Sequence, residues 1–255
     1  KILTEIKDYK IKNKVPTMAG GVFPTFAPEI VIKEKLIDIV CVGEGENALL
    51  DLCKKIEKKE DYSNLTNCWI KTIGPEYLKD RNIIKKNPIA KPVDMNKNPT
   101  IDLSLFEENR LYRPMAGKIY KMVPIETHRG CPYTCTFCDV AEKIYHYRSP
   151  ASVADEFEII KTHGIDEIHI FDDTFNIRRH RVVDLCKEII KRDLKISWST
   201  RAAVHPADRE MVSSMKQAGC KRVHCGVETL DPTVLKNIRK VQTIEQVRNF
   251  FSWCR

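Results

Sequence analysis

Residues 123–138 read VPIETHRGCPYTCTFC, a short apolar run followed directly by a loop with three cysteines. The thiols of Cys131, Cys135 and Cys138 have C-x3-C-x2-C spacing, so all three sulfurs lie on one loop and can converge on one soft metal centre. A structural zinc site needs a fourth ligand, often from a second C-x2-C pair, and the segment offers only His128. The spacing favours a four-iron cluster with one iron open to a small-molecule ligand, and zinc is the alternative.

The apolar run is the first of four that alternate with amphipathic segments. The apolar runs are 123–127, 167–171, 196–200 and 222–226, and the amphipathic segments between them are 151–162, 180–192 and 207–218. Apolar residues recur in these segments at three- and four-residue spacing, which predicts helices. One more helix is predicted to begin near Asp231 and to continue to the end of the sequence. This βαβα alternation predicts a parallel sheet with helices outside it, because parallel neighbours need a crossover connection.

An earlier αβ pattern precedes this series. Residues 15–60 contain a Gly-Gly turn, a helical stretch at 28–35, a strand at 36–42 and a further helix after the letters GEGENA. Residues 61–122 are rich in Asn, Lys and Pro and have only short strand-like pieces, so they are interpreted as a connection with at most one small hairpin. We therefore expect domains at 1–60 and 123–255, joined by residues 61–122.

Composition excludes several classes of protein. The chain has 255 residues, 42% hydrophobic and 31% charged, which suits a globular protein with a sizeable core. Its net charge of +8 is diffuse, which indicates a solvated surface more than a site for nucleic acid or anionic lipid. The longest stretch without Asp, Glu, Lys or Arg spans 14 residues, 15–28, too few to cross a bilayer. The chain opens without Met or a signal segment, and its other cysteines are scattered. We expect a piece of a longer cytoplasmic protein with reduced thiols.

The cysteine loop, C-x3-C-x-aromatic-C at the end of a first barrel strand, resembles that of the radical S-adenosylmethionine (SAM) superfamily. The resemblance implies a partial (β/α) barrel in which Cys131, Cys135 and Cys138 bind a [4Fe–4S] cluster. It also implies that the open iron chelates the amino and carboxylate groups of SAM. One electron then cleaves SAM, and the resulting 5′-deoxyadenosyl radical abstracts a substrate hydrogen. The loop lies where such barrels form their sites, at the C-terminal ends of the strands.

The same resemblance gives roles to residues at the other strand ends. The letters FDDTF replace the commoner Gly-Gly-Glu form of an acidic motif, so Asp172 and Asp173 are expected to receive the amino group of SAM; alternatively, they cap the next helix. Arg201 would pair with the SAM carboxylate, or it is a surface residue. Glu228, in a Gly-x-Glu pattern, would contact the ribose hydroxyls or the methionine end. Phe137 would contribute its backbone near the adenine, or form an apolar plug against the cluster.

The upstream half resembles the end of the cobalamin-binding domain that precedes many radical SAM barrels. GEGENA also fits a dinucleotide fingerprint superficially, but its two acids would repel a pyrophosphate at the helix N-terminus. The resemblance implies a Rossmann-like cobalamin domain, of which 1–60 is the C-terminal part, and glycines that let the backbone approach the cofactor. The residues implicated are Gly20, Gly21, Gly43, Glu44, Gly45 and Glu46. The Asp-x-His-x-x-Gly element of such domains would lie before residue 1, so a histidine ligand to cobalt stays open.

Together, the two resemblances imply a cobalamin-dependent radical SAM enzyme that transfers a methyl group to an unactivated carbon of a small-molecule substrate. Flavodoxin or ferredoxin would donate the electron. One alternative keeps these cofactors but performs oxidative ring formation or rearrangement. Another is a methylthiotransferase, which would need a second set of three cysteines; Cys41, Cys53 and Cys68 are 12 and 15 residues apart. The last is a non-catalytic metal-binding module, in which the charged residues at the strand ends would have no role.

Overall fold

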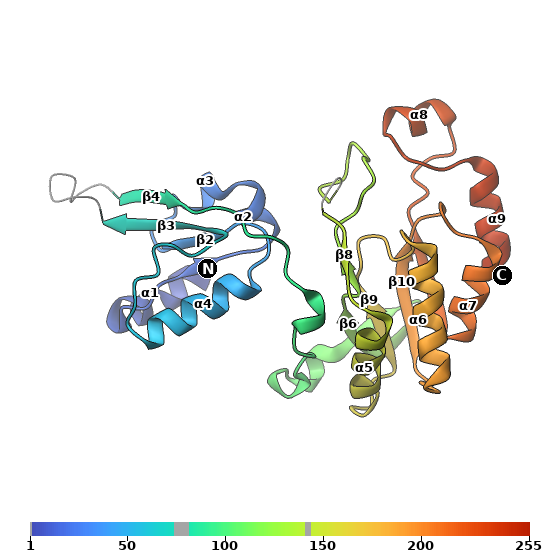
Figure 1. Cartoon of the computed structure of the whole chain (residues 1–255), viewed down its shortest axis with the longest axis horizontal. Coiled ribbons are helices and arrows are strands. Elements are labelled where there is room, and N and C mark those ends of the chain that lie inside the picture. The colour runs from blue at the N-terminus through green and yellow to red at the C-terminus, as the bar shows by residue number, and fades with distance from the viewer. Residues whose placement is uncertain (1, 74–81, 141–143) are drawn as a thin grey trace. The chain divides into compact units, whose positions relative to one another are not determined.

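The computed structural model describes residues 2–73, 82–140 and 144–255, and the chain divides into two compact units, Lys1–Val93 and Asp94–Arg255 (Figure 1). This boundary falls inside residues 61–122, the predicted connection between the domains. Strands β3 (Cys68–Ile73) and β4 (Asn82–Lys86) complete the sheet of the first unit, whereas β5 (Tyr112–Met115) and β6 (Lys118–Ile125) pair in the second. The hydrophobic pattern of these strands is weak because Lys, Asn and Pro interrupt their apolar residues.

The first unit is a four-stranded sheet in the order β1-β2-β3-β4 with helices beside it. Its elements are α1 (Ile2–Asn13), β1 (Met18–Ala19), α2 (Val22–Phe26), α3 (Pro28–Val31), β2 (Ile39–Cys41), α4 (Glu46–Glu57), β3 (Cys68–Ile73) and β4 (Asn82–Lys86). Strands β1 and β2 are parallel, and the two remaining pairs are antiparallel. Helix α4 packs Ala48 and Leu52, four residues apart, into the same core as Ile39 and Ile70.

The second unit contains a five-stranded sheet in the order β11-β10-β9-β6-β5. After short 3-10 turns at Met95–Lys97, Leu103–Leu105 and Glu108–Leu111, its elements are β5 (Tyr112–Met115), β6 (Lys118–Ile125), β7 (His128–Arg129), β8 (His146–Tyr147), α5 (Pro150–Lys161), β9 (Glu167–Ile170), α6 (Arg179–Lys191), β10 (Ser197–Ala202), α7 (Arg209–Gln217), β11 (Cys220–Cys225), α8 (Pro232–Asn237) and α9 (Ile244–Cys254). Strands β6, β9, β10 and β11 are parallel, which confirms the βαβα prediction.

One face of this sheet packs against α5, α6 and α7. Phe157 of α5, Ile168 of β9 and Trp198 of β10 are fully buried in one core. The indole of Trp198 stacks edge-on against Phe175 at 5.5 Å between ring centroids and donates a hydrogen bond to the carbonyl of Ala218 at 2.8 Å. Truncating an aromatic side chain buried in this way costs about 3–5 kcal/mol.

The other face of the same strands carries polar side chains, because successive residues of a strand point to opposite faces. Glu167 and His169 of β9 alternate with the buried Ile168 and Ile170. The parallel register places Ser199 of β10 beside His169. This polar face is called the inner face below.

Two local features end and start helices in the second unit. The helix predicted to begin near Asp231 is divided into two helices. Helix α8 ends at Asn237, Arg239 takes a positive φ of 53°, and Thr243 starts α9 with a capping box closed by Gln246.

Gly219, after α7, has φ +94°, and a Cβ there would lie 2.6 Å from the carbonyl oxygen of Ile196. Only glycine fits such a close approach.

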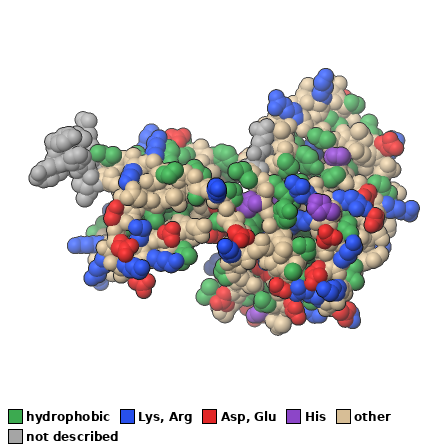
Figure 2. All heavy atoms as spheres, viewed as in Figure 1, with side chains coloured by type: hydrophobic (Ala, Val, Ile, Leu, Met, Phe, Trp, Pro, Cys, Tyr) green, Lys and Arg blue, Asp and Glu red, His purple; other side chains and the backbone are tan. Residues whose placement is uncertain are grey.

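Lys and Arg side chains alternate with Asp and Glu over the face shown in Figure 2, as expected for a solvated surface. Among the residues that the structure describes, no helix is both long enough and apolar enough to cross a membrane.

Candidate functional site

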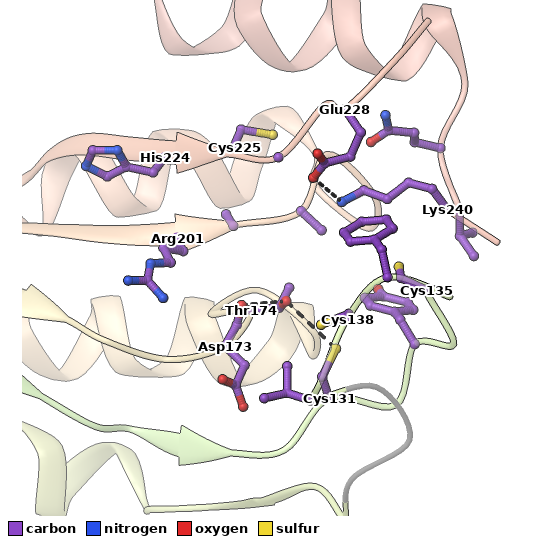
Figure 3. A pocket seen from close by; sticks show the side chains of 18 residues that line it. Cys131, Cys135, Cys138, Asp173, Thr174, Arg201, His224, Cys225, Glu228 and Lys240 are labelled. Carbon is purple, nitrogen blue, oxygen red and sulfur yellow. Dashed lines mark hydrogen bonds and ion pairs between the residues drawn. The ribbon is translucent and has the colours of Figure 1, made fainter. Parts of the chain in front are cut away.

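The cysteine loop follows β6 and forms one wall of a cavity of about 450 Å³ (Figure 3). The segment after β9 and the last residues of β10 and β11, with the residues that follow them, supply the other walls, so the cavity lies at the C-terminal ends of the parallel strands, where barrel enzymes form their sites. Its lining includes Cys131, Cys135, Phe137, Cys138, Asp173, Thr174, Arg201, His224, Cys225, Glu228, Lys240 and Gln242. The structure therefore brings together most of the site residues predicted for the barrel.

All three predicted metal ligands line this cavity. Cys131 is buried, and its sulfur lies 3.8 Å from the hydroxyl oxygen of Thr174. Burial raises the pKa of the Cys131 thiol, and the backbone of Tyr133 and the Thr174 hydroxyl oppose that effect. As the side chains stand, no three His, Cys, Asp or Glu groups of the described residues lie close enough to hold a metal ion. The donor set itself, three thiols on one short loop, suits an iron–sulfur cluster.

A short segment after α8, residues 238–242, closes the loop from the other side. The amide of Thr136 donates to the carbonyl of Ile238 at 3.1 Å, and the Cys135 thiol donates to the carbonyl of Arg239 at 3.9 Å. The side chain of Gln242 donates to the carbonyl of Val227 at 2.5 Å. The 238–242 segment thus joins the cysteine loop to the chain that follows β11.

The two adjacent aspartates have different environments, which corrects the expectation that both contact SAM. Asp173 lines the cavity. Asp172 is buried, and its carboxylate accepts hydrogen bonds from the amide of Thr127 at 2.7 Å, the amide of His128 at 3.2 Å and the Thr127 hydroxyl. Of the two aspartates, only Asp173 is among the residues that line the cavity. Asp172 instead anchors the start of the cysteine loop.

A buried charged network surrounds Asp172. Its carboxylate lies 2.8 Å from Nδ1 of His128, and Arg181 of α6 donates to the carbonyl of Thr127 at 2.8 Å and to its hydroxyl. Burial alone would raise the pKa of Asp172, but His128, Arg181 and the Thr127 hydroxyl together hold it below its ordinary value. His128 is fully buried against Asp172 and is absent from the cavity lining, so it does not fit the role of a fourth zinc ligand.

Lys240, which the sequence analysis missed, lies on the cysteine side of the cavity together with Glu228 (Figure 3). Its ammonium is 3.4 Å from the Glu228 carboxylate and 6.0 Å from the ring centroid of Phe137. Glu228 has a positive φ of 63°, Phe137 is 56% exposed, and both side chains line the cavity. Arg201 lines the same cavity, but on the side away from the cysteines. No spacing in the sequence marks Lys240, because it lies between two helices.

In the first unit, the predicted glycines occupy two loops at the C-terminal ends of the parallel strands β1 and β2. Gly21 and Gly43 have φ of +102° and +83°, with open space where a Cβ would lie. The hydroxyl of Thr25 bridges the loops, because it donates to the carbonyl of Gly21 at 2.7 Å and accepts from the amide of Gly43 at 3.0 Å. Gly20 and Gly45 both face Cys41, at 3.6 and 3.5 Å from an added Cβ.

Glu44 and Glu46, the two acids of the GEGE letters, have different surroundings. The Glu44 carboxylate accepts a hydrogen bond from the amide of Val93 at 2.6 Å, and its backbone carbonyl accepts one from the Asn67 side chain at 2.7 Å. Glu44 thus fixes the end of the first unit. Glu46 begins α4, where an acidic side chain suits the helix dipole.

Residues 125–255 match the model of the radical SAM superfamily, and the chain belongs to that superfamily of enzymes. The match begins at the end of β6 and contains all three cysteines of the loop. The match confirms the superfamily expected from the cysteine loop, and the parallel strands confirm the expected partial-barrel fold.

Among its relatives is an uncharacterized methyltransferase of Pyrococcus horikoshii, 30% identical over 92% of this chain and half of that protein. An anaerobic magnesium-protoporphyrin IX monomethyl ester cyclase of Rubrivivax gelatinosus is 29% identical over 93% of this chain and 43% of its own length. The chain therefore spans half or less of these curated relatives.

Two solved structures share the fold. One is the radical SAM methyltransferase TsrM from Kitasatospora setae, with tryptophan and a SAM analogue bound, at TM-score 0.75 and 22% identity over all of this chain and 49% of that one. The other is the cobalamin-dependent SAM radical enzyme OxsB with aqua-cobalamin and SAM bound, at TM-score 0.75 and 23% identity over 99% of this chain and 37% of that one.

Proposed function

We propose that this chain is part of a cobalamin-dependent radical SAM enzyme that transfers a methyl group to an unactivated carbon of a small molecule. The observation that carries the proposal is the cavity at the strand ends, which three loop cysteines share with Asp173, Glu228 and Lys240. A metal-binding module without catalysis would not need ionisable groups from three other segments of the chain around the thiols.

In this proposal, Cys131, Cys135 and Cys138 hold a [4Fe–4S] cluster, which supplies one electron to SAM when both are bound. The chain's own side chains then position SAM. Asp173 accepts hydrogen bonds from its amino group, Glu228 accepts them from its ribose hydroxyls, and the backbone of Phe137 lies near the adenine. Lys240 is already paired with Glu228 and fixes that carboxylate toward the cavity. Reduced flavodoxin or ferredoxin is the proposed electron donor.

The glycine loops of the first unit support the cobalamin part of the proposal. Ligands of open α/β sheets bind beyond the C-terminal ends of the parallel strands, where Gly20, Gly21, Gly43 and Gly45 lie. Next to them α2 leaves Val22 and Phe23 more than 60% exposed, an apolar surface that a large flat cofactor would cover. These residues would line the binding surface for cobalamin without ligating its metal.

A ring-forming enzyme is the second candidate, since the cyclase of Rubrivivax gelatinosus is nearly as similar to this chain as the methyltransferase of Pyrococcus horikoshii. A methylthiotransferase fits less well. Cys41 and Cys68 are buried opposite each other on β2 and β3, and Cys53 is exposed on α4, so these thiols do not share a site.

Anaerobic reconstitution of the full-length protein with iron and sulfide tests the cluster. Electron paramagnetic resonance of the reduced protein should show a [4Fe–4S]⁺ signal that changes when SAM is added. Replacing Cys131, Cys135 or Cys138 by Ala should abolish the signal, whereas Cys220→Ala, a thiol outside the cavity, should leave it intact. A signal indifferent to SAM, or zinc in place of iron, would refute the radical SAM assignment for this site.

Cobalamin and product assays test the finer proposal. The protein should retain cobalamin through gel filtration, and Gly20→Val should weaken retention because it fills space beside Cys41 without requiring a positive φ. Protein that binds a cluster but never cobalamin would contradict the cobalamin part. Product mass separates the two reactions, since methyl transfer adds one methyl group and oxidative ring closure removes hydrogen.

A further inference from the structure

The inner face of the barrel sheet carries more basic than acidic side chains where it meets the cavity. Arg201 of β10 pairs in register with His224 of β11, and both line the cavity. Figure 3 shows the two side chains together, on the side away from the three cysteines. This end of the cavity is separate from the cysteine side that holds Glu228 and Lys240.

The acid of β9 on the inner face is already paired within the protein, whereas Asp173 lines the cavity itself. Glu167 is 1% exposed, accepts a hydrogen bond from Ser199 at 2.6 Å and forms an ion pair with Arg222. Arg222 in turn donates to the hydroxyl of Tyr120 at 3.1 Å. One of the two arginines on this face is therefore engaged by an ion pair and a hydrogen bond within the protein.

Arg201 is different. Its guanidinium lies over the ring of Phe171, 4.2 Å from the ring centroid, and its side chain forms no hydrogen bond or ion pair with any residue that the structure describes. Stacking fixes the plane of a guanidinium but leaves its N–H donors available. A planar fork of donors held at the wall of a cavity suits bidentate binding of a carboxylate or a phosphate.

The surroundings favour an anion at this place. His169 lies 6.1 Å from His224 between ring centroids, and its Nδ1 is 3.0 Å from the Ser199 hydroxyl. Burial first, then the positive charge of Arg201 and the neighbouring His224, lower the pKa of His169. A bound anion beside Arg201 would offset that positive potential and raise the pKa again.

We infer that Arg201, with His224 beside it, binds an oxyanion of the substrate, a carboxylate or a phosphate, and so orients the substrate at the end of the cavity opposite the cysteines. The inference rests on the proposed function, in which the cysteine side holds the cluster and SAM. It assigns Arg201 to the substrate instead of to the SAM carboxylate that the sequence analysis expected.

To test this, the histidine ring signals of the full-length protein are recorded by NMR while inorganic phosphate or acetate is added. The variants His169→Gln and His224→Gln identify which signals belong to these two residues. We expect the His224 signal to shift and the pKa of His169 to rise. Arg201→Gln should weaken the response about tenfold. Arg201→Lys should retain part of it, and Lys216→Gln, which removes an exposed charge of α7, should not change it. A response to phosphate alone assigns a phosphorylated substrate, and a response to acetate alone a carboxylate.

Two results would overturn the inference: no response of wild-type protein to either anion, or loss of SAM binding in Arg201→Gln, which would return Arg201 to SAM. SAM affinity is measured in parallel on the reconstituted protein and should be unchanged in Arg201→Gln. If the wild-type protein binds neither a cluster nor SAM, the proposed function fails, while the anion titration still reports on Arg201. The two failures are thus distinguishable.

Discussion

Replacing Asp172 by Asn should destabilise the second unit strongly, although the change removes no atoms from the core. The carboxylate is 1% exposed, accepts from two backbone amides and the Thr127 hydroxyl, and faces His128 and Arg181. An amide at this place presents an NH₂ group to donors and leaves Arg181 without its buried counter-charge. Removing one partner of a buried ion pair costs about 3–5 kcal/mol. For a unit of this size, that corresponds to a fall in Tm of about 6–20 °C.

Thermal and urea unfolding of the protein before cluster reconstitution measure this effect. Asp173→Asn is the matched control, because Asp173 is the next residue and lines the cavity. Its stability should stay within about 0.5 kcal/mol of wild type, while its affinity for SAM falls. The reasoning is refuted if Asp172→Asn is as stable as wild type, or if it loses SAM binding while Asp173→Asn retains it.

The pH dependence should agree with this picture. Because the pKa of Asp172 is held below its ordinary value of 3.8 in the folded state, its stabilising contribution is present above about pH 3.8. The contribution is lost as the pH falls through the lower folded-state pKa. Acid unfolding of Asp172→Asn should lack this component, whereas Asp173→Asn should keep it.

Three further predictions concern stability. Gly219→Ala should lower the free energy of unfolding in urea by about 2–4 kcal/mol, because the new Cβ would lie 2.6 Å from a carbonyl oxygen. Gly164→Ala is the control, since Gly164 also has a positive φ but lies in open space, and it should cost about 1 kcal/mol. Equal losses in the two variants would contradict the argument. Ser149→Ala should cost about 1 kcal/mol, because Ser149 accepts from the amide of Ser152 at the start of α5; no loss would mean that water replaces the cap. The pKa of His169 is lowered from 6.5 in the folded state, so its contribution to stability is present above about pH 6.5 and is lost as the pH falls through the folded-state pKa. His169→Gln should therefore make the free energy of unfolding less dependent on pH in that range. An unchanged pH profile would show that His169 is not the group responsible.

The barrel sheet was predictable because its strands and helices differ in hydrophobic period. Residues 167–171 predicted β9, and 180–192 predicted α6, each within a residue or two of the observed bounds. The start of β6 at Lys118 was not predicted, since its first residues pair with β5 and alternate polar with apolar side chains instead of forming a continuous apolar run. Edge and antiparallel strands give a weaker signal than buried parallel ones.

The positions of the site residues at the strand ends were predictable, since Asp173, Arg201 and Glu228 line the cavity with the cysteines, but the directions of their side chains were not. The three cysteines are fixed by their spacing on one loop, but the direction of a side chain at a strand end depends on where the strand stops. Asp172 and Asp173 are therefore indistinguishable in the sequence and opposite in the structure. Lys240 approaches the cysteine loop through the turn between α8 and α9, a contact that only the folded chain defines.

The hydrogen bonds between the cysteine loop and the 238–242 segment have a consequence for the order of synthesis. Cys135 and the carbonyl of Arg239 are 104 residues apart in the chain. A growing chain therefore carries its three thiols long before it can make the backbone that closes the loop over them. Until α8 and the turn after it have emerged, these thiols are held from one side only and are open to oxidation or to a competing metal. Cluster insertion is thus best matched to a chain synthesised past residue 242, and a chain cut before residue 238 should lose its iron more readily than one that extends past residue 242.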